Sequence, residues 1–352
     1  MEINSNFWFG RSVFLTGHTG FKGGWTALWL SKMGAKVHGY SLEPEHTPNF
    51  FTETMLSERL TSSTIADIQN FSSLKSAMSF ANPSVIIHMA AQPLVRESYK
   101  DPIKTFKINT IGTLNLLEVS RKINSVEAIV NITTDKCYEN EEKLKPFLES
   151  DKLGGYDPYS SSKACAELVS SAYRNSFLQE IGIKIATARA GNVIGGGDWS
   201  TDRLIPDFLR AIDNSEKLFI RSPNAVRPWQ HVLEPVSGYL MLAEKLVTNG
   251  NIFAEAWNFG PQENDSKPVS WVINYLSQKV PNLKWDIDKT AQPHEAKLLL
   301  LDNSKAKSKL NWKPKWSIKT ALDKTIEWHQ AWKESELMNE RSLSQINSYL
   351  DN

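Results

Sequence analysis

Two hydrophobic patterns alternate along the first half of the chain. Short runs of apolar and β-branched residues predict buried strands, and the longer segments that follow them have apolar residues at helical spacing. We expect strands at residues 12–16, 36–40, 84–88, 128–132 and 183–188. We expect helices at residues 25–33, 103–122, 159–174 and 203–213. Largely apolar strands separated by helices are typical of a parallel sheet covered on both faces.

The pattern changes near residue 190. Beyond that point Gly, Asp, Pro, Arg and Trp become frequent, and the alternation of strands and helices weakens. We therefore predict a sheet domain over residues 1–190, to which the chain returns around 231–260. Residues 191–230 and 255–352 are expected to form mainly a smaller C-terminal lobe and the terminal helices. Such a lobe would close over the carboxyl ends of the strands, where ligands bind in open α/β sheets.

The composition is that of an ordinary globular protein, with 352 residues, of which 41% are hydrophobic and 22% charged. A core of this size needs no disulfide or metal for stability, and we predict no metal site. The 40 Lys and Arg residues nearly balance the 39 Asp and Glu residues, so the net charge is +1. This balance predicts no nucleic-acid partner and no attraction to an anionic membrane.

Targeting signals and cysteines also bear on the location of the protein. The chain begins without a basic segment followed by an apolar stretch, and no apolar run reaches membrane-spanning length. Two cysteines, Cys137 and Cys165, are too few for a disulfide framework. We expect Cys137 to be a packed small residue and Cys165 to be buried on its helix. These features predict a cytoplasmic protein.

Three glycines at three-residue spacing, Gly17, Gly20 and Gly23, stand between the first strand and the first helix. Glycine at such positions permits a tight turn, close approach of the backbone to a pyrophosphate, and tight packing of helix on strand. The helix N-terminus offers N–H groups and a positive dipole end to the phosphates. A purely structural turn is the alternative. We favour a Rossmann-type doubly wound parallel sheet whose cofactor-binding residues include Gly17, His18, Thr19, Gly20, Phe21, Lys22 and Gly23.

The end of the second strand indicates which dinucleotide binds. The acidic residue that would mark NAD is missing there, and Ser41 stands near its place. From Ser41 to Phe51 no Lys or Arg is present to meet the 2′-phosphate of NADP. We therefore predict NAD, with Ser41 beside its ribose.

Further cofactor contacts are expected at the ends of the next two strands. Asp67 and Ile68 lie about where a third strand ends, and Asp67 is equally compatible with an adenine contact and with a plain loop acid. Small residues after the strand at 84–88 would let the backbone run along the cofactor, although a packed turn is the alternative. The residues concerned are Ala90, Ala91 and Gln92.

Tyr159 and Lys163 lie four residues apart on a predicted helix, which places both on one face. A nearby ammonium favours the phenolate and lowers the pKa of the tyrosine, making it a usable base at neutral pH. Chance supplies many such pairs, but a polar cluster ends the preceding strand. Its members are Thr133, Thr134, Asp135 and Lys136. Without Tyr159 and Lys163, a solvated loop with a local ion pair would be the better interpretation.

These motifs together resemble the extended short-chain dehydrogenase/reductase superfamily and, within it, the sugar-nucleotide 4,6-dehydratases. The resemblance covers nearly the whole chain and rests on Gly17, Gly20, Gly23, Asp67, Asn109, Thr134, Asp135, Tyr159 and Lys163. The dTDP-glucose enzymes carry Asp-Glu after the threonine, where this chain has Asp135-Lys136. Asp-Lys and the Gly-Gly-Gly-Asp-Trp loop at 195–199 look like the CDP-glucose members.

The resemblance implies roles for the clustered residues in the dehydration of a nucleotide-sugar, with CDP-glucose favoured. Tyr159 would take the proton of the sugar O4 while a hydride leaves C4 for NAD, Lys163 would hold the ribose, and Thr134 would bind O4. Protonated Asp135 would donate to the C6 hydroxyl as water leaves, and Lys136 would assist removal of the C5 proton or stabilise the enolate. Asn109 and Thr133 are expected near the cofactor.

Arginines are the expected partners of the substrate's diphosphate, because the guanidinium binds phosphate through two parallel hydrogen bonds. The candidates are Arg96, Arg203 and Arg227, with Asn192 and Asn258 as neutral donors. A surface ion pair is the alternative for each arginine. The helices at 103–122 and 159–174 match the dimer helices of the superfamily, which implies a homodimer or homotetramer. A CDP-glucose product would imply deoxysugar synthesis for a surface polysaccharide such as the lipopolysaccharide O-antigen.

Other functions remain open at the level of the sequence. A dehydratase for dTDP-glucose or UDP-glucose would use the same residues. A nucleotide-sugar 4-epimerase or reductase would keep Tyr159 and Lys163 but has no need for an acid at Asp135. An NAD-binding scaffold protein without activity would keep the glycines, but it would have little reason to keep Thr134, Tyr159 and Lys163 together.

Overall fold

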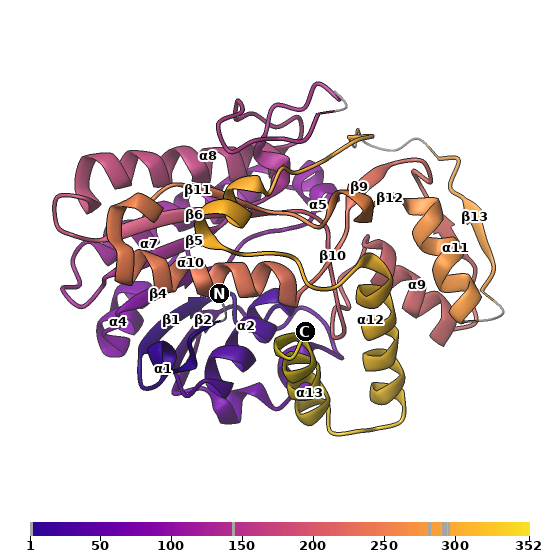
Figure 1. Ribbon diagram of the computed structural model, residues 1–352, viewed down its shortest axis with the longest axis horizontal. Coiled ribbons are helices and arrows are strands. Elements are labelled where there is room, and N and C mark those ends of the chain that lie inside the picture. Colours follow the sequence, from indigo (N-terminus) through magenta and orange to yellow (C-terminus); the bar gives the residue numbers. More distant parts are fainter. Residues whose placement is uncertain (1–2, 143–144, 281–282, 291–293, 295) are drawn as a thin grey trace.

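The computed structural model describes residues 3–142, 145–280, 283–290, 294 and 296–352. Within them, seven parallel strands form the central sheet, in the spatial order β11, β6, β5, β4, β1, β2, β3 (Figure 1). The strands are β1 Ser12–Thr16, β2 Lys36–Ser41, β3 Ser62–Ile65, β4 Val85–His88, β5 Ala128–Ile132, β6 Lys184–Ala190 and β11 Ala256–Phe259. The strand order reverses beside β1, and this is where ligands bind in open α/β sheets.

Side chains of each strand alternate between two helical layers. Val13 and Leu15 pack on the layer of α2 and α10, whereas Phe14 packs on the layer of α4 and α7. The longer helices of the layers are α2 Phe21–Lys32, α4 Phe71–Ala81, α7 Gly112–Ser120, α8 Pro158–Tyr173 and α10 Leu233–Asn249. The segment 231–260 therefore adds a helix and an edge strand to the sheet.

Short elements connect these layers. The helices and turns among them are α1 Ser5–Trp8, α3 Phe50–Glu53, η1 Leu56–Arg59, α5 Val95–Lys100, α6 Pro102–Phe106, η2 Lys107–Ile111, η3 Asp135–Cys137, η4 Arg174–Leu178, η5 Gly250–Phe253, η6 Glu263–Asp265 and η7 Ala306–Leu310. The helix expected at 103–122 is thus interrupted by one π-helical turn, η2. The helix expected from residue 25 begins earlier, at Phe21, directly after the glycine-rich turn.

A smaller lobe lies at one end of the sheet, on the right of Figure 1. Its own apolar core joins α9, α11 and α12. The elements outside the main sheet are β7 Val193–Ile194, α9 Leu204–Asp213, β8 Leu218–Ile220, β9 Val226–Pro228, β10 Gln230–His231, β12 Ser266–Pro268, α11 Val269–Lys279, β13 Trp285–Ile287, α12 Ile318–Lys333 and α13 Met338–Leu350. The terminal helix α13 returns to pack against α2.

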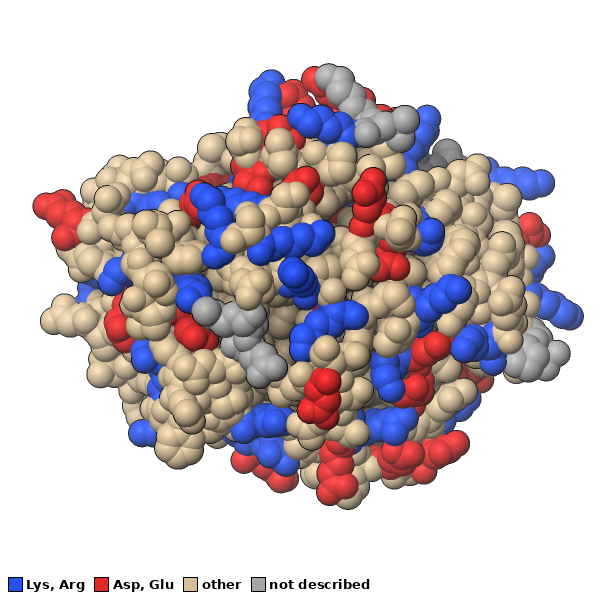
Figure 2. All heavy atoms as spheres, in the orientation of Figure 1, with Lys and Arg blue, Asp and Glu red and all other residues tan. Residues whose placement is uncertain are grey.

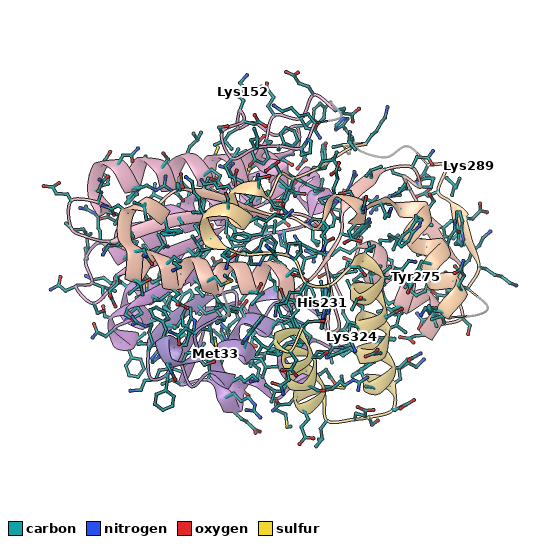
Figure 3. The ribbon with its side chains drawn as sticks, in the orientation of Figure 1. Met33, Lys152, His231, Tyr275, Lys289 and Lys324 are labelled. Carbon is teal, nitrogen blue, oxygen red and sulfur yellow. The ribbon has the colours of Figure 1, made fainter. Side chains whose placement is uncertain are left out.

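His231, labelled in Figure 3, lies where the two parts of the molecule meet. Its ring contacts Trp25 of α2 at 6.1 Å and Trp316, just before α12, at 4.8 Å between centroids. Burial lowers the pKa of His231 to about 3, so the ring is neutral at physiological pH. An aromatic contact thus connects the sheet layer to the lobe.

Surface charge and the burial of the two cysteines can be compared with the predictions from composition. Both signs of charge intermingle on the face in Figure 2, in keeping with the net charge of +1. Among the described residues, no helix is long and apolar enough to cross a bilayer. Cys137 is buried, as expected. Cys165 is partly exposed, so its predicted burial is wrong; helical spacing alone did not show that position 165 lies beside the packed face of α8.

Candidate active site

The glycine-rich turn has the geometry of a phosphate-binding loop. Gly17 has a φ of +78°, and a Cβ there would lie 2.9 Å from the backbone nitrogen of Ala90. A Cβ on Gly23 would lie 2.0 Å from the carbonyl oxygen of Gly17. Gly20 forms the N-cap of α2, and the helix starts at Phe21 with its first N–H groups at the sheet edge. A dinucleotide pyrophosphate fits this loop.

The far end of the loop meets the ends of β2 and β3. The hydroxyl of Thr19 lies 2.8 Å from that of Ser41 and donates to the carbonyl of Leu42, also at 2.8 Å. Asp67 is half-buried, and its carboxylate accepts from the backbone N–H of Gln69 at 2.8 Å. The imidazole of His18 points the other way, since its Nε2 lies 2.8 Å from the hydroxyl of Ser63.

Asn109 fixes the turn after β4. Its Oδ1 accepts from the backbone N–H of Gln92 at 2.8 Å, and its Nδ2 donates to the carbonyl of Gln92 at 3.0 Å and to the hydroxyl of Ser162 at 2.9 Å. Asn109 therefore holds the Ala90–Gln92 segment against α8. The π-helical turn η2 carries Asn109, and Ile68 of the predicted cofactor set packs beside it against Gly112.

The predicted catalytic cluster comes together at the carboxyl end of β5. Helix α8 begins at Pro158 because Asp157 accepts a hydrogen bond from the backbone N–H of Ser160 at 2.9 Å. This places Tyr159 in the first turn of the helix. Thr134 hydrogen-bonds the phenol of Tyr159 and donates to Oδ1 of Asp135 at 3.1 Å.

The electrostatics differ from the expectation for Tyr159. Burial raises the pKa of Tyr159 to about 12, although the hydrogen bond with Thr134 opposes this rise. Burial also lowers the pKa of Lys163 to about 8, and its ammonium donates to the carbonyl of Ile132 at 2.9 Å. In the protein alone the net shift of the Tyr159 pKa is upward, because burial outweighs the opposing effects of Thr134 and Arg203. The predicted lowering by Lys163 stays a prediction.

Asp135, the predicted proton donor, is buried in this cluster. Burial raises the pKa of Asp135 to about 6, and the charges of Lys136, Arg227 and Lys22 oppose this rise. Its Oδ2 has no hydrogen-bond partner among the described residues. A Cβ on Gly191 would lie 3.1 Å from that oxygen. A buried carboxyl near its titration point, with one oxygen uncommitted, suits a proton donor.

Two more side chains belong to this pocket. Burial and the nearby cations of Arg203 and Lys163 lower the pKa of Lys22 to about 7. Lys22, predicted as a cofactor residue, therefore also faces the catalytic cluster. Tyr239 of α10 was missed: its buried hydroxyl has no partner among the described residues, and burial together with Asp135 and Tyr159 raises its pKa. Position 239 reads as part of an apolar helix, so the sequence offers no signal for it.

The predicted substrate arginines already make contacts within the protein. Arg96 pairs with Asp202 at 2.8 Å, and Arg203 pairs with Asp198 at 3.1 Å. The charge of Arg203 acts on the pKa of Tyr159, and that of Arg227 acts on the pKa of Asp135. A further cation was missed by the sequence analysis. It is Arg221, which lies 3.6 Å from the same oxygen of Asp202.

The two predicted asparagines differ. Asn192 is partly exposed beside β7, and its carbonyl accepts from the backbone N–H of Gln230 at 3.0 Å. Asn258 is fully buried; its Oδ1 accepts from Tyr138 at 2.7 Å and its Nδ2 donates to the carbonyl of Phe147 at 2.9 Å. These contacts commit both polar groups of Asn258 and do not support its prediction as a substrate donor.

Sequence relatives of the chain include nucleotide-sugar enzymes. The CDP-glucose 4,6-dehydratase of Salmonella typhimurium (strain LT2) is 47% identical over 99% of this chain and 98% of its own length. The UDP-glucuronate 4-epimerase of Thermodesulfobacterium geofontis is 30% identical over 74% of this chain and 77% of its own length. The former confirms the resemblance drawn from the motifs.

Solved structures share the fold. The UDP-glucose 4-epimerase of Thermotoga maritima with UDP-glucose has a TM-score of 0.77 at 24% identity, covering 91% of this chain and 99% of that one. MoeE5 in complex with UDP-glucuronic acid and NAD has a TM-score of 0.78 at 21% identity, with the same coverage. The Rossmann-type sheet is thereby confirmed. Because the model of the GDP-mannose 4,6 dehydratase family matches residues 14–325, the chain belongs to that family.

Proposed function

We propose that this protein dehydrates CDP-glucose to CDP-4-keto-6-deoxyglucose with NAD as a tightly bound cofactor. The observation that carries the proposal is the buried carboxyl of Asp135, held beside the hydrogen-bonded pair of Thr134 and Tyr159. Oxidation of an alcohol needs a base to remove the hydroxyl proton, whereas the loss of water also needs an acid to protonate the leaving hydroxyl. The Asp-Lys sequence and the 47% identity to a CDP-glucose enzyme favour cytidine over other nucleotides.

The loop from Gly17 to Gly23 would hold the cofactor's pyrophosphate, and the absence of a basic residue near Ser41 favours NAD over NADP. Bound NAD supplies hydride acceptance from the sugar C4 and hydride return to C6. The remaining chemistry belongs to side chains of this chain. Tyr159 accepts the O4 proton. Thr134 hydrogen-bonds both the phenol of Tyr159 and the sugar O4. Lys163 stabilises the phenolate that this step requires.

The second step is an elimination. The C4 ketone makes the C5 proton acidic; a base removes that proton, the electron pair forms the C5–C6 double bond, and the C6–O bond breaks. Asp135 donates its proton to the departing hydroxyl, which leaves as water. Lys136, adjacent to Asp135 at the start of η3, would assist at C5 or stabilise the enolate.

The diphosphate of the substrate needs cations near the catalytic cluster. Arg227 and Arg203 are proposed as its partners because their charges already act on Asp135 and Tyr159. Arg96 would bind the diphosphate as well, by giving up its ion pair with Asp202 for one with a phosphate group. Asn192, partly exposed at the same strand end, would donate a neutral hydrogen bond.

We also propose a homodimer or homotetramer that acts in the cytoplasm, in the synthesis of deoxysugars for a surface polysaccharide. Support for self-association comes from apolar side chains left exposed on neighbouring helices. Ile103 of α6, Ile111 of η2 and Leu168 of α8 are 68%, 47% and 58% exposed. Sedimentation velocity would measure the state, and a monomer at micromolar concentration would contradict this part of the proposal.

A nucleotide-sugar panel tests the reaction itself. The protein is incubated separately with CDP-glucose, dTDP-glucose and UDP-glucose, and products are identified by mass and NMR. We expect a 4-keto-6-deoxy product, lighter by one water, from CDP-glucose. An isomer of unchanged mass would indicate an epimerase, and no product from any sugar would indicate a binding protein. The Tyr159→Phe variant should bind NAD without turnover, which separates catalysis from cofactor loss.

A further inference from the structure

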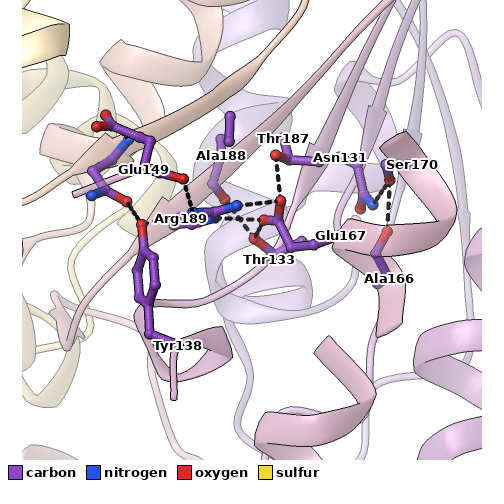
Figure 4. Close-up of polar contacts among 12 residues, drawn as sticks. Asn131, Thr133, Tyr138, Glu149, Ala166, Glu167, Ser170, Thr187, Ala188 and Arg189 are labelled. Atoms are coloured by element: carbon purple, nitrogen blue, oxygen red, sulfur yellow. Dashed lines mark hydrogen bonds and ion pairs between the residues drawn. The ribbon is translucent and has the colours of Figure 1, made fainter. Parts of the chain in front are cut away.

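Helix α8 contacts three consecutive residues at the end of β5, and Figure 4 shows the contacts of two of them, Asn131 and Thr133. Asn131 donates to the hydroxyl of Ser170 at 2.8 Å. The carbonyl of Ile132 accepts from Lys163 at 2.9 Å, and the hydroxyl of Thr133 donates to Glu167 at 2.5 Å. Residues 163, 167 and 170 lie on one face of the helix, since they are separated by four and three positions. The catalytic helix is therefore joined to the catalytic strand by polar contacts, where apolar packing would be the rule.

Glu167 is the centre of these contacts. Both of its oxygens accept from Arg189 of β6, at 2.9 Å from Nε and 2.7 Å from Nη2. Thr187 of the same strand donates to Oε2 at 2.7 Å. Glu167 and Arg189 are 4% and 3% exposed. Burial acts to raise the pKa of Glu167, but these hydrogen bonds outweigh it, so the carboxylate remains charged.

The network continues to the loop that covers the strand ends. Arg189 also donates to the phenol oxygen of Tyr138 at 2.7 Å, and Tyr138 donates to Asn258 of β11 at 2.7 Å. The backbone N–H of Asn258 donates to Glu149 at 2.9 Å. Three adjacent strands and the 147–149 segment thus share one buried set of hydrogen bonds with α8.

We propose that Glu167 is a positioning residue for the dehydration. Anchored by Arg189, it fixes the backbone of Thr133 relative to α8, and so sets the distance from Thr134 and Asp135 to Tyr159. The proposal rests on the function proposed above. Its physical basis is continuity: Thr134 and Asp135 follow the residue that Glu167 holds, and Tyr159 precedes Glu167 by two helical turns.

The charge of Glu167 has a second effect, on Lys163 one turn away. Burial lowers the pKa of Lys163, and Glu167 opposes that change. The other groups that face Lys163 are Tyr159, one turn before it on α8, and Cys137, His88 and Lys22. The phenol, the thiol and the imidazole are neutral, because burial raises the pKa of Tyr159 and of Cys137 and lowers that of His88 to about 3. Lys22 adds only like charge, so Glu167 is the anion that keeps Lys163 protonated.

A matched pair of variants separates positioning from stability. Thr133→Val and Thr187→Val each remove one hydroxyl donor to Glu167, but only Thr133 adjoins the catalytic residues. We expect similar losses of thermal stability, with kcat for CDP-glucose reduced about tenfold in Thr133→Val and within twofold of the wild type in Thr187→Val. The Thr133→Ser variant restores the donor and should restore kcat. Although Thr133 is expected near the cofactor, its hydroxyl is committed to Glu167, so the affinity for NAD, followed by fluorescence, should stay unchanged in all three variants.

Equal kcat values for the two valine variants would overturn the proposal, as would a loss of NAD affinity that accounts for the whole effect. Failure of the proposed function is a separate outcome. In that case the wild type itself would not convert CDP-glucose, and the comparison of variants would be made on the nucleotide-sugar that it does convert.

The charge effect has its own test. In Glu167→Gln the alkaline limb of the kcat profile should move down by about one pH unit, because Lys163 loses its proton earlier. Since that variant leaves Arg189 buried without its anion, the double variant Glu167→Gln/Arg189→Met serves if the single variant does not fold. It lacks the same anion but also the cation of Arg189, so the limb should move in the same direction by a smaller amount. An unmoved alkaline limb in the variant that folds would exclude this role of Glu167.

Discussion

Two buried acids near the end of β5 behave in opposite ways. Glu167 accepts hydrogen bonds from an arginine and two threonines, and these contacts lower its pKa below the ordinary value. Asp135 accepts from Thr134 on one oxygen, the other has no partner among the described residues, and burial raises its pKa to about 6. Equal burial therefore leaves one carboxyl charged and raises the pKa of the other, which suits the proton donor proposed for Asp135. The number of donors decides between them.

The largest effect expected from this contrast is on turnover. Replacing Asp135→Asn removes the proton donor while keeping the shape of the side chain, and kcat should fall by about a hundredfold or more. The fold should survive, because no buried partner is left without its hydrogen bond. Steady-state kinetics and thermal unfolding would measure both. Wild-type turnover by Asp135→Asn would remove Asp135 from the mechanism.

The opposite result is expected for the structural anion. Glu167→Gln leaves the guanidinium of Arg189 buried and uncompensated, which costs about 3 to 5 kcal/mol of unfolding free energy. Urea unfolding monitored by circular dichroism would measure the loss. If Glu167→Gln were as stable as Asp135→Asn, the distinction drawn between the two acids would not hold.

The pH dependence of stability gives a third test. The pKa of Asp135 rises from an ordinary 3.8 to about 6 on folding, so the folded state favours its protonated form. The stabilisation is complete below pH 3.8 and disappears as the pH rises through 6, a change of about 3 kcal/mol. The wild type should therefore lose more unfolding free energy than Asp135→Asn between pH 4 and pH 8. Parallel curves for the two proteins would mean that Asp135 stays charged.

Crowding the uncommitted oxygen should have a smaller effect. A Cβ on Gly191 would lie 2.4 Å from Cγ of Pro228 and 3.1 Å from Oδ2 of Asp135. The backbone must shift to admit it, so Gly191→Ala should cost about 1 to 3 kcal/mol of stability and reduce kcat about tenfold. Enzyme assays alongside thermal melts would show this, and an unchanged kcat would place the reactive oxygen elsewhere.

The smallest effect concerns the diphosphate. Asp202→Asn removes the carboxylate that pairs with Arg96, and the freed guanidinium should lower KM for CDP-glucose about twofold with little change in stability. Asp286→Asn is the matched control, because it breaks another exposed ion pair of the lobe, with Lys217. A KM that changes equally in both variants would argue against a substrate role for Arg96.

The sequence predicts what depends on local pattern. Five of the seven strands of the sheet, the glycine-rich turn and the placement of Tyr159 and Lys163 on one helix follow from spacing within short segments. Thr134 and Asp135 could be placed at the sheet edge because parallel strands end together there.

The rest depends on contacts between distant segments. Tyr239 reaches the pocket from an apolar helix, and Asn258 turns into a buried network instead of toward substrate. The pKa of Tyr159 is raised because burial, which spacing does not reveal, exceeds the opposing effects of the Thr134 hydrogen bond and the Arg203 charge. Glu167 lies one helical turn after Lys163, but its charged state and its role depend on Arg189, which lies on a separate strand and could not be paired with it from the sequence.

The position of β11 at the sheet edge has a consequence for how the protein is made. Asn258 completes the hydrogen bonds of Tyr138, and its strand pairs with β6 in register from Ala256 to Phe259. When only the first 190 residues have emerged from the ribosome, the glycine-rich loop and helix α8 have already been synthesised. That nascent chain still lacks β11, the strand that pairs with β6. The network of Arg189 on β6 is therefore incomplete, because Tyr138 has no Asn258 to bond. Assembly of a working centre is thus delayed until some seventy further residues have emerged.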